Sequence, residues 1–315
     1  MVLAAVSMVA CGGGDDTDAS TTTSTTAAET TTTAESAPLP DLGGRLMFSR
    51  FNEANHEFES THTADPDGGN EVELTLPGPE GGGRWSNDGA HISVMTILDD
   101  GRVGTAILTA DGEVERVLPI PHPTLNIVCT VWSPDDTRLA CEGFDDTDPS
   151  LTGIYLVNAS DGQDLVRLTT PPSGLVDFPG EFSPDGTTLL FNRVEGEANG
   201  PLLIVDVAGG EPRPLGDGEY EDSGRYSPDG SQIATASDGA IVVLDLEGNE
   251  LERFTQPGDF LFGPAWSPDG EWLAYSGASV GPHADIFVSR PDGSDVHRIT
   301  ETPQNEILVE WSHPS

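Results

Sequence analysis

The fold is decided by a short stretch, Trp266-Ser267-Pro268-Asp269-Gly270, which recurs with small changes along the chain. Proline presets the first turn residue, aspartate hydrogen-bonds to nearby backbone, and glycine accepts the positive φ that re-entering a strand requires. The stretch therefore predicts a tight hairpin between two antiparallel strands. Each copy begins at an aromatic residue, and these are Trp85, Trp132, Phe182, Tyr226, Trp266 and Trp311.

Successive copies lie 40 to 50 residues apart, which is the length of one four-stranded blade of a β-propeller. Among the first five copies the turn glycine is replaced once, by Asp136, a residue type that tolerates a positive φ better than most. Seven positions beyond the aromatic residue, an apolar side chain recurs and predicts the buried face of the second strand. These apolar residues are Ile92, Leu139, Leu189, Ile233 and Leu273.

The two ends of the repeat region complement each other. Residues 45–50 resemble a second strand, with Leu46 and Phe48 at its buried positions, but no hairpin motif precedes them. Residues 307–311 supply a first strand without a second. We therefore predict an all-β fold over residues 41–315: a six-bladed propeller of four-stranded antiparallel blades, closed by pairing the C-terminal strand with the N-terminal blade.

The repeats resemble those of the TolB-like propeller family over residues 44–315. The similarity is strongest in residues 284–294, Ala-Asp-Ile-Phe-Val-Ser-Arg-Pro-Asp-Gly-Ser, followed by Arg298-Ile299-Thr300. The family includes periplasmic interaction proteins and the propeller parts of larger hydrolases. The resemblance therefore implies an exported binding protein without naming its ligand.

The N-terminal region predicts export and a lipid anchor. Residues 1–11 are apolar and end in Met8-Val9-Ala10-Cys11, which resembles a bacterial lipoprotein signal with Cys11 as the lipidated residue. The segment lacks a positively charged start and is short, so we expect the true translation start upstream of Met1. Residues 12–40, rich in Thr and Ser, cannot bury enough apolar surface to fold and predict a flexible tether.

The charge of the chain excludes several ligand classes. The formal net charge is −41, and all 13 basic residues are arginine. Without lysine, neither a Walker-type phosphate loop nor Schiff-base chemistry is available. An acidic surface also repels nucleic acid, because it offers no cations to the phosphates.

Cys129 and Cys141 flank the Trp132 hairpin symmetrically and should face each other on adjacent strands. In an oxidising compartment such a pair predicts a disulfide, and the alternative is two buried free thiols. No histidine or third cysteine stands at a metal-ligand spacing.

Two further motifs carry weaker hypotheses. Acidic clusters lie at Asp99-Asp100, at Asp145, Asp146 and Asp148, and at Glu219 with Glu221-Asp222. They could bind a cationic ligand, with Ca²⁺ at Asp145, Asp146 and Asp148, although solvated loop carboxylates are the simpler interpretation. Residues 277–281 match G-x-S-x-G, but a nucleophile elbow needs a helix for which there is no room, so we reject it. We expect no cofactor.

The leading functional hypothesis is a non-enzymatic binding scaffold of the cell envelope, since the sequence contains no catalytic constellation. We expect it to be a monomer that binds a protein or glycan partner at the loop face. The alternatives are a propeller-fold carbohydrate-active enzyme, a lyase or glycosidase, and a structural spacer without a ligand. The expected exposed contacts are Phe178, Tyr220, Phe260, Phe262, His122 and His283.

Overall fold

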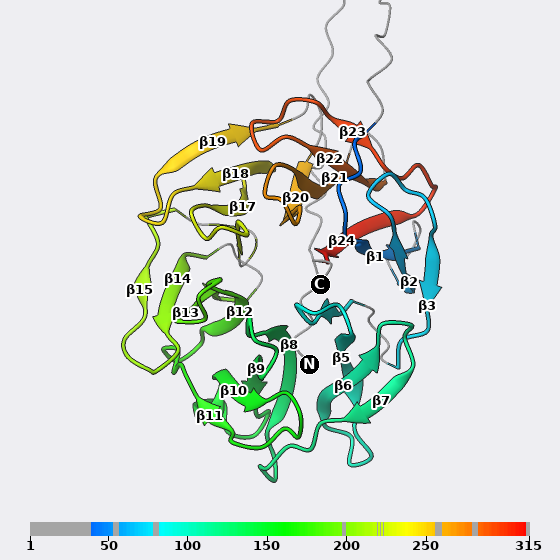
Figure 1. Ribbon diagram of the computed structural model, residues 1–315. Helices are drawn as coiled ribbons and strands as arrows, with labels where there is room; N and C mark the ends of the chain where they lie inside the picture. Colours follow the sequence, from blue (N-terminus) through cyan, green and yellow to red (C-terminus); the bar gives the residue numbers. More distant parts are fainter. Residues whose placement is uncertain are drawn as a thin grey trace, which may run out of the picture.

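The computed structural model describes residues 39–52, 57–77, 82–196, 200–218, 220, 222, 224–255, 260–278 and 283–312. Their strands form six four-stranded antiparallel sheets, which stand as blades around a central axis (Figure 1). The chain runs once around the ring, from blue to red in Figure 1. The predicted six-bladed propeller is therefore confirmed.

Blade 1 contains β24 (Asn305–Trp311), β1 (Leu46–Phe51), β2 (Phe58–Ala64) and β3 (Val72–Leu74). Blade 2 contains β4 (Arg84–Trp85), β5 (His91–Ile97), β6 (Val103–Thr109) and β7 (Val114–Val117). Blade 3 contains β8 (Asn126–Trp132), β9 (Arg138–Phe144), β10 (Gly153–Asn158) and β11 (Val166–Arg167), with a short 3₁₀ helix at Pro149–Leu151.

Blade 4 contains β12 (Val176–Phe182), β13 (Thr188–Val194), β14 (Leu202–Asp206) and β15 (Arg213–Pro214). Blade 5 contains β16 (Arg225–Tyr226), β17 (Ile233–Ser237), β18 (Ala240–Leu244) and β19 (Glu250–Phe254). Blade 6 contains β20 (Phe260–Trp266), β21 (Leu273–Ala278), β22 (Ala284–Ser289) and β23 (His297–Arg298).

The ring closes as the sequence predicted. β24 pairs with β1 antiparallel, with Leu46 opposite Trp311, and the Ser312 amide donates to the Arg45 carbonyl at 2.8 Å. Blade 1 thus combines residues from both ends of the described chain, and closure satisfies strand edges that would otherwise be free.

The core lies between neighbouring blades. The apolar side chain seven positions beyond each of the first five aromatic markers is fully buried, as predicted. One cluster joins Val131 of blade 3 to Phe182 and Leu189 of blade 4, and the others also combine buried side chains of the sheets. In the described part of the chain, no helix is long and apolar enough to cross a membrane.

The two faces of the disk are built differently. The hairpin face, as we name it, carries the turns between the first and second strands of the blades. In each described W-S-P-D-G-type turn the serine hydroxyl donates to the aspartate two residues later, for example Ser133 to Asp135 at 2.7 Å and Ser183 to Asp185 at 2.7 Å. The loop face carries the segments that lead into the first strands and those that join the second strand to the third.

Candidate functional site: a charged cavity in the channel

The first strands surround a cavity of about 190 Å³ at the centre of the ring. Its mouth lies on the hairpin face, because turn residues such as Asn87, Pro134, Pro184 and Pro228 line it. Deeper in the cavity lie the aromatic markers of all six blades and the residues that precede them. The wall aromatics are Trp85, Trp132, Phe182, Tyr226, Trp266 and Trp311.

Charge enters the cavity at the pre-aromatic position, which we define as the residue immediately before each aromatic marker. From blade 1 to blade 6, this position holds Glu310, Arg84, Val131, Glu181, Arg225 and Ala265. The order glutamate, arginine, small apolar residue occurs twice. The two carboxylates therefore come from opposite blades, as do the two guanidiniums.

β-bulges precede this position in several first strands. The pairing register shifts between Cys129 and Val131 in β8 and between Pro179 and Glu181 in β12. It shifts again between Phe262 and Ala265 in β20. A bulge bends its strand and re-aims the next side chain, which explains how residues of a packed sheet can line the channel.

The two carboxylates make the same contact in the two halves of the ring. Glu310 Oε2 accepts from the Trp85 amide of the next blade at 2.6 Å, and Glu181 Oε2 accepts from the Tyr226 amide of its next blade. The guanidinium of Arg84 donates to the Gly180 carbonyl at 2.7 Å. Within the described residues, no ion pair joins the carboxylates to the guanidiniums.

Burial shifts the pKa values of Glu310, Glu181 and Arg84. Burial raises the pKa of Glu310 to about 7, and the charges of Arg84 and Arg225 oppose that rise only in part. Burial likewise raises the pKa of Glu181. The pKa of Arg84 falls to about 10, first because of burial and then because of Arg225. Four incompletely solvated ionisable groups thus share one cavity.

One indole departs from the pattern of its counterparts. Trp132 Nε1 donates to the Arg84 carbonyl and Trp266 Nε1 to the Arg225 carbonyl, each at 3.1 Å. Trp85 is 9% exposed, and its Nε1 atom is buried without a hydrogen-bond partner among the described residues. The donor of this one indole is therefore unmet within the described part of the chain.

The contact residues predicted from the sequence lie away from this cavity. Tyr220 and Phe262 are 6% and 8% exposed, so the expectation that they are exposed is wrong. Each packs in a core cluster, because a segment leading into a first strand lies between two blades. Phe260 is 48% exposed.

The remaining three predicted contacts are partly buried. Phe178 lies within β12, and His283 lies just before β22. His122 shapes its own loop, since its Nδ1 accepts from the Leu125 amide at 3.2 Å. The structure does not bring these side chains together with the charged cavity.

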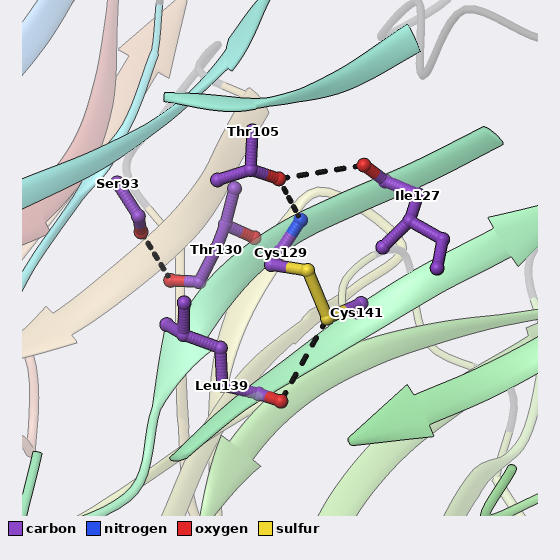
Figure 2. The surroundings of a disulfide bond; sticks show 7 residues. All are labelled: Ser93, Thr105, Ile127, Cys129, Thr130, Leu139 and Cys141. Carbon is purple, nitrogen blue, oxygen red and sulfur yellow. Dashed lines mark hydrogen bonds between the residues drawn. A yellow bond between two sulfur atoms is a disulfide. The ribbon is translucent and has the colours of Figure 1, made fainter. Parts of the chain in front are cut away.

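Cys129 and Cys141 lie opposite each other on β8 and β9 and are joined by a disulfide (Figure 2). The Cys129 amide donates to the Thr105 hydroxyl of blade 2 at 2.7 Å. Figure 2 also shows Ser93 of blade 2 donating to the carbonyl of Thr130, which lies within the β8 bulge. The cross-linked strands are thus also tied to the neighbouring blade.

The acidic loop of blade 3 uses carboxylates for its own turn. Asp145 Oδ1 accepts from the Thr147 and Asp148 amides at 2.8 and 3.0 Å. Asp148 Oδ1 accepts from the Ser150 amide at 3.1 Å. Within the described residues, no three His, Cys, Asp or Glu side chains are grouped to hold a metal. A Ca²⁺ site that includes Asp146 stays a prediction.

Several predicted features lie outside the described residues. These are Cys11 with the signal segment, the tether up to residue 38, residues 279–281 of the G-x-S-x-G match, and Glu219 and Glu221.

Sequence reasoning missed the pre-aromatic residues because it treated the hairpins only as scaffold. A signal was present: the motif copies agree from the aromatic residue onward, while the residue just before it changes between acidic, basic and apolar. A charged residue at the inner end of a packed strand departs from the local pattern, and such departures mark candidate sites.

No protein-family model matches the chain. It is 27% identical over 155 residues to the "Uncharacterized peptidase YuxL" of Bacillus subtilis, a match that covers 46% of this chain and only 21% of that protein. It is 27% identical over 209 residues to the "Uncharacterized protein Atu1656" of Agrobacterium fabrum, covering 60% of this chain and 67% of that protein.

Two TolB structures show the same fold. The Acinetobacter baumannii protein aligns with a TM-score of 0.62 and 18% identity, over 86% of this chain and 68% of its own. The Agrobacterium tumefaciens structure aligns with a TM-score of 0.59 and 18% identity, over 85% of this chain and 98% of its own. The chain is therefore a six-bladed β-propeller of the TolB-like fold, with a charged cavity in its channel.

Proposed function

We propose that the protein is a non-enzymatic binding scaffold of the cell envelope, which takes a segment of a protein partner into its central cavity from the hairpin face. The observation that carries this proposal is the set of four charged side chains that line one cavity without ion pairs to one another. Polar groups arranged in this way are typical of a site that completes its interactions with a ligand.

The location in the envelope rests on the resemblance to TolB proteins and on the N-terminal segment, with Cys11 as the proposed lipid attachment residue. A lipid-anchored propeller would meet partners outside the cytoplasm. Metabolic labelling with an alkyne fatty acid, compared between the wild type and Cys11→Ser, tests the anchor. Equal labelling of both proteins would refute it.

The binding proposal is tested by site-specific photo-cross-linking in the native cells. A photoreactive residue replaces the exposed Pro184 at the cavity mouth or, as the matched control, the exposed Asp99 on the loop face. We expect a discrete cross-linked protein from position 184 only. Cross-linking to that protein from position 99 alone would move the site to the loop face.

One observation favours a second candidate, a carbohydrate-active enzyme. Glu181 and Glu310 lie on opposite blades, and burial raises the pKa of both carboxyls. In glycosidases, one carboxyl with a raised pKa acts as the general acid, while a second carboxylate stays ionised as nucleophile or base. Either Glu181 or Glu310 could act as the acid. Glycan screening with product detection, repeated on Glu310→Gln, distinguishes the two functions: turnover that the substitution abolishes supports the enzyme.

A further inference from the structure

The charges around the cavity alternate in sign. Each half of the ring contributes a carboxylate followed by a guanidinium, Glu310 with Arg84 and Glu181 with Arg225. A ligand that is only anionic would meet two carboxylates, and one that is only cationic would meet two guanidiniums. Like charges at short range disfavour both ligands. The arrangement is complementary to a ligand that carries both signs.

The guanidiniums keep donors to offer. The hydrogen bonds of these groups go to backbone carbonyls, from Arg84 to Gly180 at 2.7 Å and from Arg225 to Gly224 at 3.0 Å. A guanidinium has five N–H donors in a planar fork that matches a carboxylate. Donors therefore remain for an anionic group in the cavity.

The carboxylates keep acceptors in the same way. Glu310 and Glu181 each use Oε2 to accept from a backbone amide of the next blade. An ionised carboxylate has two oxygens with about four acceptor directions. Acceptor capacity therefore remains on both carboxyl groups, and a bound ammonium group would favour the ionised form that burial opposes. The amide contacts hold the two side chains in place.

We infer that the cavity recognises a zwitterionic group, a carboxylate and an ammonium within one short peptide segment, with the carboxylate at Arg84 or Arg225 and the ammonium at Glu181 or Glu310. This inference rests on the proposed binding function and specifies its ligand chemistry. The cavity, of about 190 Å³, exceeds the roughly 150 Å³ that accommodates a benzene-sized ligand.

Three dipeptide probes test the inference on the wild-type protein. Glycylglycine carries both charges, N-acetylglycylglycine only the carboxylate, and glycylglycinamide only the ammonium. Four of the five tryptophans line the cavity, so intrinsic fluorescence reports binding, and calorimetry checks it. We expect the Kd of glycylglycine to be at least tenfold lower than that of either analogue. Equal affinity for an analogue, or no saturable binding of glycylglycine, would overturn the inference.

Two double variants then test the assignment of charges. Arg84→Gln with Arg225→Gln should make the ammonium probe the tightest, and Glu181→Gln with Glu310→Gln should do the same for the carboxylate probe. Phe260→Ala on the loop face is the control and should keep the wild-type order. Unchanged selectivity in both folded double variants would contradict the assignment.

The outcome is separable from that of the proposed function. If position 184 still cross-links a partner while the dipeptides fail, the zwitterion inference is wrong and the scaffold function stands. If the dipeptides bind as expected but no partner is cross-linked, the cavity chemistry stands and the protein-binding function fails.

Discussion

The hairpin face and the loop face differ in how uniform their sequences are from blade to blade. The hairpin face repeats one turn with nearly the same residues, whereas the loop face varies in length and composition from blade to blade. The charged cavity nevertheless opens on the repeated face. A uniform repeat therefore does not exclude a site, because a single variable residue beside the repeat can provide its chemistry.

The hairpin face also contains a local exception to its own pattern. A β carbon at the turn glycines Gly230 and Gly270 would lie 3.3 Å from the proline of the preceding blade, so these turns pack glycine against proline. Between blades 2 and 3, Asn87 replaces the proline and Asp136 replaces the glycine. Asp136 Oδ1 accepts from the Asn87 amide at 2.7 Å, and Oδ2 accepts from the Asp88 amide at 2.9 Å.

The largest expected effect is a loss of partner binding at the cavity, which opens on the hairpin face. Arg84→Glu combined with Arg225→Glu should reduce the cross-linked complex formed from position 184 at least tenfold, because four carboxyl groups and no guanidinium would then line the cavity. The measurement is the cross-linked fraction at equal protein concentration, with unchanged circular dichroism. Full complex formation would show that the cavity charges do not contribute.

The disulfide joins the first and second strands of blade 3, β8 and β9. Replacing Cys129 and Cys141 together by alanine should lower the free energy of unfolding by about 2–4 kcal/mol, since the bond no longer restricts the unfolded chain. Urea unfolding of both proteins measures the loss. The cavity should still bind, because neither sulfur lines it; a change below about 0.5 kcal/mol would contradict a stabilising role.

The Asn87–Asp136 contact between blades 2 and 3 can be tested by replacing it with the proline–glycine contact of the other blades. Asp136→Ala should cost about 1–3 kcal/mol, because it leaves backbone amides without their acceptor and places alanine at φ 56°. Asp136→Gly with Asn87→Pro recreates the common contact and should recover most of the loss. Asp99→Ala on the loop face is the control, and thermal unfolding is the measurement. If the double substitution recovers no stability, the two kinds of turn packing are not equivalent.

Buried carboxyls on the two sides of the disk should give the same pH dependence. Burial raises the pKa of Glu310 to about 7, and burial alone raises that of Glu142, in the loop-side half of β9, to about 7. A raised folded-state pKa gives stability that is full below about pH 4.5 and is lost as the pH rises towards 7.

Glu142→Gln and Glu310→Gln should therefore match the wild type near pH 4.5 and exceed its stability at pH 8 by about 1–2 kcal/mol. Urea unfolding at both values measures this difference. Only Glu310→Gln should also change dipeptide selectivity. If the variants were instead more stable than the wild type only at low pH, the pH dependence would have the opposite sign and would contradict the burial of these groups.

The smallest effect is expected for the exposed aromatic of the loop face. Phe260→Ala removes a side chain that is 48% exposed and does not line the cavity. The free energy of unfolding should change by less than about 1 kcal/mol, and the cross-linked fraction should not change. A loss of the complex would restore the loop face as the binding surface.

The sequence predicted the blades because their determinants are local. Turn residues and a period of two fix each hairpin and the buried side of each second strand, and Leu46 with Trp311 showed how the ends join. The site was not predicted, because the bulges that direct Glu181 and Val131 into the channel depend on the packing of whole blades. Tyr220 and Phe262 were misjudged for the same reason, since connecting segments are buried between blades.

The pairing of β24 with β1 has a consequence for the order of folding. Residues 46 and 311 must meet across nearly the whole folded chain, so blade 1 cannot form until the last strand has been synthesised. Until then β1 exposes an unpaired edge that another chain could occupy. Ring closure is thus the step that converts an aggregation-prone intermediate into a ring in which the edge of β1 is paired.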